Sequence, residues 1–304
     1  MNSKRRVWLA AFAVPMMLAA CASEPSAADD RIVDVATGRA LEVADVLRRL
    51  RAADVVLLGE LHDNPHHHAR RAALLAAIGV PVVVVAEHLP RAAAFVRLPA
   101  DAAGDTLRRA LEGAGFEARA WRWPLHEPLF TAVARAGHTL QGGNLDRDAA
   151  RRLAREGAGA LPAPLRPLVD AAPLAAEARA ALEADLLRGH CGHLPAERSE
   201  GLVAAQRGRD AAMAAAMLAA MPSGASGTGA PVVLLAGNNH VRRDYGVPQL
   251  LSRHGAPLRV LSIAFVEPGG GASGSPPYDI VWTTPAATRE DPCKAFTAPR
   301  SSGG

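Results

Sequence analysis

The sequence contains few residues of several reactive or strongly charged kinds. Aromatic residues make up 4% of the 304 positions, and there are only three cysteines and two tyrosines. The formal net charge is +4, and Lys4, Arg5 and Arg6 supply three of those charges. The remaining chain is nearly balanced, so there is no electrostatic basis for binding nucleic acid. His-Glu-x-x-His and Gly-x-Ser-x-Gly motifs are also absent, so neither the zincin nor the standard serine-hydrolase mechanism is supported.

The N-terminal residues have the composition of an export signal. A positive stretch precedes an apolar run at residues 7–18, which is too short to span a hydrocarbon core of ~30 Å. Leu-Ala-Ala then leads into Cys21, in a pattern that resembles the lipobox of bacterial lipoproteins. We therefore expect residues 1–20 to be a signal peptide and Cys21 to carry the lipid anchor. No aspartate follows Cys21, which favours the outer membrane, with the protein facing the periplasm.

The rest of the chain is expected to form one large domain. Residues 22–30 are small, polar and proline-containing, and we interpret them as a tether. Residues 31–298 are then long enough for a single α/β domain with a substantial core.

Two cysteines remain after Cys21. In an oxidising periplasm Cys191 and Cys293 are expected to form a disulfide. A competing interpretation places Cys191 in a metal site with His190 or His193.

Four segments share a pattern typical of buried strands. Each has a run of β-branched or leucine residues that ends abruptly in polar residues, at 54–60, 81–87, 138–144 and 231–240. The segment at 138–144 has the weakest pattern, because its run is short and only partly apolar. Such continuous apolar runs fit parallel strands that are covered on both faces. A fifth candidate strand lies at 258–266.

Helical patterns alternate with these strands. Asn64 and Pro65 predict a helix start, followed by an apolar stripe of Leu74, Leu75 and Ile78. Residues 41–51 and 127–136 are further predicted helices, and residues 148–221 contain only helix formers interrupted by prolines. The expected fold is therefore α/β, with a mostly parallel sheet flanked by helices and a helical insertion or lid between the third and fourth predicted strands.

Polar side chains follow the predicted strands at the edge where ligands bind in open parallel sheets. The predicted strands are followed, in order, by Glu60 with His62 and Asp63, by Glu87 with His88, by Asn144 with Asp146 and Arg147, and by Asn239 and His240 with Arg242, Arg243, Asp244 and Tyr245. Each residue alone has an ordinary structural explanation, but their gathering at one edge predicts a shared ligand site.

Other residues are weaker candidates for the ligand site. The run His66, His67 and His68 falls in the first turn of a helix, where a solvated role is expected. Trp121, Trp123 and His126 are expected in the core, although they are also possible pocket residues.

Two motifs are specific, namely Gly-Glu-Leu-His at 59–62 and Gly-Asn-Asn-His-Val-Arg-Arg-Asp-Tyr-Gly-Val-Pro at 237–248. They are accompanied by Gly-Asn-Leu-Asp at 143–146, His190-Cys191 and Arg209-Asp210. Together these motifs resemble the ChaN-type haem-binding uptake lipoproteins of the Tiki superfamily, and the resemblance runs from about residue 50 to Cys293. The family resemblance implies a role in iron acquisition, haem bound between two protomers as a homodimer, and iron coordination by tyrosine.

Tyr245 is the favoured ligand for ferric haem, because Arg242 and Arg243 precede it and positive charge favours the phenolate. Tyr278 is the other choice, but the neighbouring Asp279 opposes a phenolate. The arginines are alternatively expected to bind haem propionates, and His62 or His240 to ligate iron or to hydrogen-bond the phenolate.

An enzymatic alternative uses the same edge. Glu60, His62, Glu87 and His240 are suited to hold Zn²⁺ or Mn²⁺ with an open position and to activate water for hydrolysis. On this alternative the protein is a metal-dependent hydrolase.

Overall fold

The computed structural model describes residues 30–93, 95–221, 229–253, 255, 257–269, 275–291, 293 and 294. The predicted signal peptide, Cys21 and most of the predicted tether lie outside the described residues. Among the residues described, no helix has the length and apolar character needed to cross a membrane.

One eight-stranded sheet runs through the described part of the chain, in the order β1-β8-β7-β2-β6-β3-β5-β4. The strands are β1 (Arg31–Asp34), β2 (Val55–Leu58), β3 (Val83–Pro90), β4 (Val96–Arg97), β5 (Thr139–Asn144), β6 (Val232–Leu235), β7 (Val260–Val266) and β8 (Ile280–Thr283). The pairs from β8 through β5 are parallel, whereas β1 and β4 add antiparallel edges. The sheet is therefore mixed and mostly parallel, as the sequence predicts.

The central strands are those with continuous apolar runs. Every residue of β2 and β6 is buried, because helices cover both faces of the sheet. All five predicted strands are present, and the structure adds β1, β4 and β8. These three are short edge or near-edge strands, and none has more than three consecutive apolar residues.

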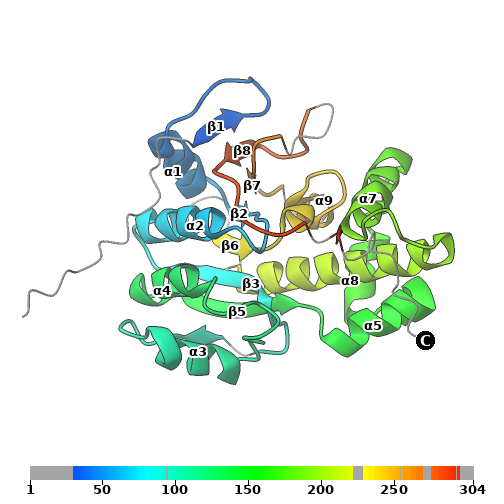
Figure 1. The fold of residues 1–304 in the computed structure, drawn as a ribbon, viewed down its shortest axis with the longest axis horizontal. Coiled ribbons are helices and arrows are strands. Elements are labelled where there is room, and N and C mark those ends of the chain that lie inside the picture. Colours follow the sequence, from blue (N-terminus) through cyan, green and yellow to red (C-terminus); the bar gives the residue numbers. More distant parts are fainter. Residues whose placement is uncertain are drawn as a thin grey trace, which may run out of the picture.

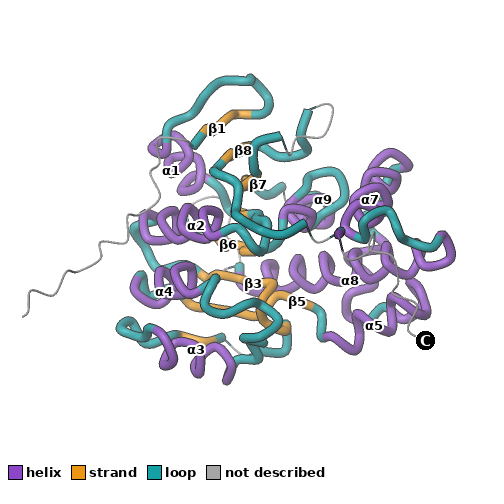
Figure 2. The backbone as a smooth tube through the Cα atoms, in the orientation of Figure 1, coloured by secondary structure: helices purple, strands orange, loops and turns teal. Residues whose placement is uncertain are grey.

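One face of the sheet is covered by α1 (Val43–Ala52), α2 (Pro65–Ala77), α3 (Gly104–Gly113) and α4 (Glu127–Arg135). The opposite face is covered by α5 (Arg147–Glu156), α8 (Ala196–Ala220) and α9 (Val247–Leu251). Figure 1 shows these two groups of helices on either side of the strands, and Figure 2 shows the same layers by secondary structure. The core thus consists of two apolar layers separated by the sheet.

The segment between β5 and β6 is helical, as predicted. It contains α5, α6 (Arg166–Asp170), α7 (Ala176–Gly189) and α8, with short 3-10 turns at Gly157–Ala160 and Ala163–Leu165. Only part of this insertion stands apart from the sheet, because α8 packs against β5, β3 and β6. Cys191, in the turn between α7 and α8, is bonded to Cys293 with a Cα–Cα distance of 5.5 Å.

Helix α2 begins as the sequence predicts. The Asn64 side chain accepts hydrogen bonds from the amides of His66 and His67, and Pro65 occupies the first helical position. The expectation of a solvated histidine run is wrong, however, for His67 and His68, which are fully buried. Helix α2 packs against α4 as well as the sheet, so its first turn faces protein on more than one side.

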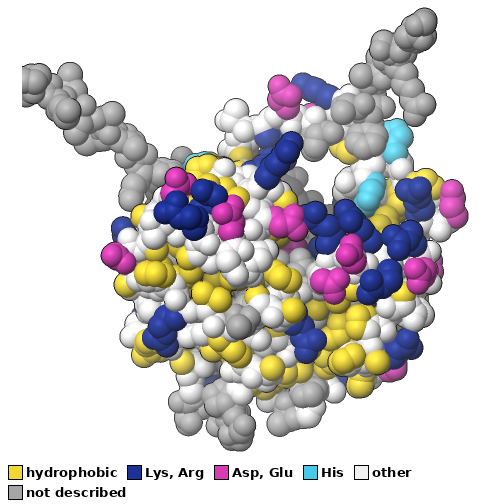
Figure 3. All heavy atoms as spheres, turned by 90° about the horizontal axis from the view of Figure 1, so that it is seen from below, with side chains coloured by type: hydrophobic (Ala, Val, Ile, Leu, Met, Phe, Trp, Pro, Cys, Tyr) yellow, Lys and Arg dark blue, Asp and Glu magenta, His cyan; other side chains and the backbone are white. Residues whose placement is uncertain are grey.

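Charges of both signs are mixed on the visible surface. In the view of Figure 3, Lys and Arg side chains lie among Asp and Glu side chains. This mixture matches the small net charge of the chain.

Candidate ligand site at the carboxyl ends of the strands

A cavity of about 680 Å³ opens at the carboxyl ends of β2 and β6. Its lining includes the predicted residues Glu60, His62, Asp63, Asn239 and His240. Trp121 and His126, which were expected in the core but were also possible pocket residues, line the cavity as well. The remaining lining residues are Leu61, Ala120, Arg122, Gly189, Gln206, Gly237 and Asn238. We call this cavity the strand-end pocket.

Gly59 has a packing role in the first motif. A Cβ atom there would lie 2.3 Å from Asn238 Oδ1 and 2.7 Å from Val241 Cγ2. The missing side chain lets the segment after β6 close against the end of β2, which brings the two motifs 59–62 and 237–248 together.

Glu87 links two histidines of the pocket. Its Oε1 lies 3.4 Å from His240 Nε2, and its Oε2 lies 3.8 Å from His62 Nε2. The amide of Gly237 also donates to Glu87 Oε2 at 2.7 Å. Burial alone raises the pKa of this carboxyl group, but His240, His62 and the Gly237 amide hold the pKa well below its usual value. Glu87 is therefore ionised, and it lies within β3 and not beyond its end.

His240 lies between two carboxylates. Its Nδ1 is 2.6 Å from Asp210 Oδ1 on α8, and Glu87 faces its other nitrogen. Burial lowers the pKa of His240, yet Glu87 and Asp210 together raise the pKa to about 10. The ring is thus an imidazolium with both N–H groups engaged, and an imidazolium has no lone pair for a metal ion.

A second layer of ionisable side chains lies beneath the pocket and surrounds Glu60. We call it the inner cluster; it consists of Glu60, His68, Arg71, His88 and His126, which are all 2% exposed or less. Arg71 forms a salt bridge with Glu60, and His68 Nδ1 is 2.9 Å from Glu60 Oε2. Glu60 Oε1 faces His88 Nε2 at 3.5 Å and His126 Nε2 at 3.6 Å.

The histidines of the inner cluster are neutral. Burial lowers the pKa of His68 to about 4 and that of His126 to about 2, and it places the pKa of His88 well below the usual value. Among the histidines, His62 makes the closest contact with Glu60, at 2.8 Å from Nδ1 to Oε1, but its side chain is 44% exposed. The sequence pattern gave no indication that His68, Arg71 and His126 would converge on Glu60.

Tyr245, the favoured iron ligand, is fully buried. Its hydroxyl donates to Asp185 Oδ2 of α7 at 2.6 Å, and the Arg242 guanidinium lies 4.5 Å from the ring centroid. Burial raises its pKa above the ordinary value despite the opposing effect of Arg242. In this conformation Tyr245 is a neutral phenol that does not line the strand-end pocket.

The two arginines before Tyr245 have separate environments. Arg242 pairs with Asp244 and with Asp185, the latter at 3.1 Å, and its side chain is largely buried. Arg243 is half-exposed and pairs with Asp279 at 2.7 Å. Tyr278 is partly buried, and burial raises its pKa to about 12.

The predicted residues after β5 lie in a neighbouring depression. Asn144, Asp146 and Arg147 line a separate cavity of about 280 Å³ together with Glu87 and His88. Asp146 caps α5 by accepting from the Ala149 amide at 2.8 Å, and Arg147 pairs with Glu117. His190 and His193 are exposed, and each has its Nδ1 beside a main-chain carbonyl.

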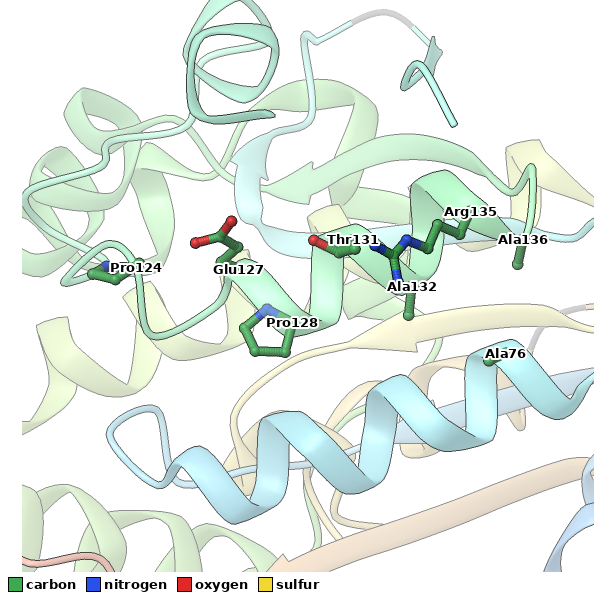
Figure 4. Close-up of a pocket in the computed structure, with 8 residues that line it drawn as sticks. All are labelled: Ala76, Pro124, Glu127, Pro128, Thr131, Ala132, Arg135 and Ala136. Carbon is green, nitrogen blue, oxygen red and sulfur yellow. The ribbon is translucent and has the colours of Figure 1, made fainter. Parts of the chain in front are cut away.

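A further groove, between α2 and α4, is lined by few reactive side chains. Figure 4 shows its lining, with Ala76 on α2 opposite Pro128, Thr131 and Arg135 of α4. Glu127 at its end accepts a hydrogen bond from the Gly104 amide at 2.6 Å. The reactive side chains are concentrated at the strand-end pocket.

The fold and this pocket define a class: α/β proteins with a mostly parallel sheet and a ligand pocket at the carboxyl ends of its central strands. A model of the family described as "Haem-binding uptake, Tiki superfamily, ChaN" matches residues 46–251. The chain belongs to this family.

A solved structure has the same fold. It is described as "Cofacial heme binding to ChaN of Campylobacter jejuni", and it superposes with a TM-score of 0.63 at 19% identity. The match covers 84% of this chain and 96% of that chain. No curated protein sequence matches the chain significantly.

Proposed function

We propose that this protein is a haem-binding lipoprotein of the cell envelope that acts in haem or iron uptake. The observation that carries the proposal is the family match over residues 46–251, which includes every side chain of the strand-end pocket. Lipid on Cys21 would anchor the protein in the outer membrane, facing the periplasm, and haem would join two copies as a homodimer.

The strand-end pocket has groups suited to haem. Trp121 and Leu61 offer apolar surface for the macrocycle, and the Arg122 side chain at the rim is 70% exposed and suited to pair with a propionate. Bound haem would supply a ferric iron centre, which favours an anionic oxygen ligand such as a phenolate.

Tyr245 is the proposed iron ligand, and the structure adds a condition. Its partner Asp185 lies one helical turn before Gly189 of α7, and Gly189 lines the pocket. The phenol is therefore held against α7 and does not line the pocket. Ligation requires this part of α7 to move and Asp185 to release the hydroxyl.

The alternative function, a metal-dependent hydrolase, would use side chains at the same edge of the sheet. Glu60, His62, Glu87 and His240 are linked in a continuous series of contacts. Because both nitrogens of His240 are engaged by carboxylates, the geometry supports haem binding better than a metal centre that uses His240.

The test compares ferric-haem titrations of Tyr245→Phe and Tyr278→Phe, followed by visible absorption. The soluble mature chain without Cys21 is used. We expect the charge-transfer band of a phenolate complex in Tyr278→Phe and in the unmodified chain, and its loss in Tyr245→Phe. A band that persists in Tyr245→Phe and disappears in Tyr278→Phe would reassign the ligand. If neither substitution changes the spectrum, the ligand is not tyrosine, and the exposed His62 becomes the first candidate.

A further inference from the structure

The inner cluster contains buried nitrogen atoms without hydrogen-bond partners among the described residues. Both ring nitrogens of His88 and Nε2 of His126 lack one, although these side chains are only 2% and 1% exposed. Buried polar atoms without partners are rare in native proteins, because each loses its hydration without compensation. A cluster of them around one carboxylate therefore calls for an additional bound species.

We propose that the inner cluster binds a divalent transition-metal ion through Glu60, His68 and His126. Each of these residues offers one ligand atom, and the three atoms all lie within 4.8 Å of one another. His88, whose Nε2 is 3.5 Å from Glu60 Oε1, stands beside the set as a further donor.

The orientation of the two histidines supports this assignment. His126 Nδ1 lies 3.0 Å from the Trp121 carbonyl oxygen, so it donates its N–H there and its Nε2 lone pair faces Glu60. His68 Nε2 lies 3.2 Å from the His62 carbonyl oxygen, which leaves its Nδ1 toward the same carboxylate. In metal sites, ligating histidines are held in this way by a second-shell acceptor on the opposite nitrogen.

Two imidazoles and one carboxylate form a donor set that suits Zn²⁺ and similar divalent ions. The ion would connect the segment after β2, the first turn of α2 and the start of α4, which supply Glu60, His68 and His126 respectively. Access is available from the strand-end pocket, because Glu60 and His126 also line it.

Arg71 is the competing cation. It already forms a salt bridge with Glu60, and its Nη2 lies 3.1 Å from His68 Nδ1. A bound ion would share Glu60 with Arg71 and displace the guanidinium from His68. The site shares Glu60 with the set Glu60, His62, Glu87 and His240 but uses different histidines. The proposal does not depend on haem binding.

The experiment uses haem-free mature protein without a polyhistidine tag, stripped with a chelator and then titrated with Co²⁺ and Zn²⁺. The variants are His126→Gln and His68→Gln. The matched control is His138→Gln, which changes another buried histidine whose two nitrogens contact the Val82 amide and the Leu75 carbonyl oxygen. Melting temperatures without metal verify that each variant folds, and a Glu60→Gln variant provides a second ligand change.

We expect the unmodified chain and His138→Gln to bind one ion per chain, with visible d–d bands for Co²⁺ and a higher melting temperature. Loss of a direct ligand should weaken metal binding at least as much as the largest effect of changing a second-shell residue. We therefore expect the affinity for the ion to fall on the order of 100-fold or more in His126→Gln and His68→Gln. The proposal is overturned if no saturable binding occurs or if these variants bind as tightly as the control. Loss of binding in His62→Gln or His240→Gln, with full retention in His126→Gln and His68→Gln, would equally overturn it.

Discussion

At the scale of single residues, the protonation state of His240 distinguishes the two functions that the sequence allows, haem binding and metal-dependent hydrolysis. As a metal ligand it must be neutral, whereas between Glu87 and Asp210 it is an imidazolium. Its pKa of about 10 in the folded protein lies above the ordinary value of 6.5. A raised pKa means that the protonated ring stabilises the fold fully below pH 6.5, and that this contribution is lost as the pH rises through about 10.

We therefore predict that raising the pH from 7 to 10 destabilises the unmodified chain more than His240→Gln. The difference should exceed about 1.4 kcal/mol, the equivalent of one pKa unit. Urea unfolding of both proteins across this pH range measures it. An equal pH dependence in the two proteins would show that His240 is not held as an imidazolium.

Residue identity alone predicted only part of the site. Glu60, His62 and His240 could be assigned because they follow apolar runs, and the ends of parallel strands meet at one edge. His126 and Arg71 could not be assigned in this way. They reach Glu60 because α2 and α4 pack together, and that tertiary contact leaves no periodic signal in the sequence.

At the scale of elements, α7 holds the side chain of Tyr245 through Asp185. Asp185 accepts the phenol hydroxyl and also pairs with Arg242 and Arg188, so it connects the helix to the motif after β6. If haem binds only when this connection is open, the apparent affinity is reduced by the fraction of molecules that are open.

We predict that Asp185→Ala increases the apparent affinity for ferric haem, by a factor on the order of 10, which is about 1.4 kcal/mol. Glu183→Ala on the same helix is the matched control, because Glu183 pairs only with Arg179 among the described contacts. Competition titration against a haem-binding reference protein gives the affinities. Weaker binding in Asp185→Ala would mean that the closed arrangement is the binding-competent one.

The elements themselves were predictable where one physical signal dominated. Strands β2, β3 and β6 have continuous apolar runs, and Asn64-Pro65 marks the start of α2. In contrast, β4 has only two residues, and β1 and β8 alternate between buried and partly exposed positions. Their place in the sheet depends on pairing with distant strands, which local sequence does not encode.

At the scale of the whole molecule, the polar and ionisable side chains at one edge of the sheet form two layers. The outer layer is the open strand-end pocket, where we propose haem, and the inner layer is the closed cluster around Glu60, where we propose a metal ion. Glu60 belongs to both layers, so the two ligands are expected to influence each other.

The central claim is that this protein binds haem specifically, and equilibrium titration of the mature chain with ferric haem tests it most directly. Absorption changes report binding, and sedimentation velocity of the same samples reports assembly. We predict saturation at one haem per chain, together with a shift of the sedimenting species from monomer to dimer. A linear, unsaturable response that matches that of the heat-unfolded chain would contradict it.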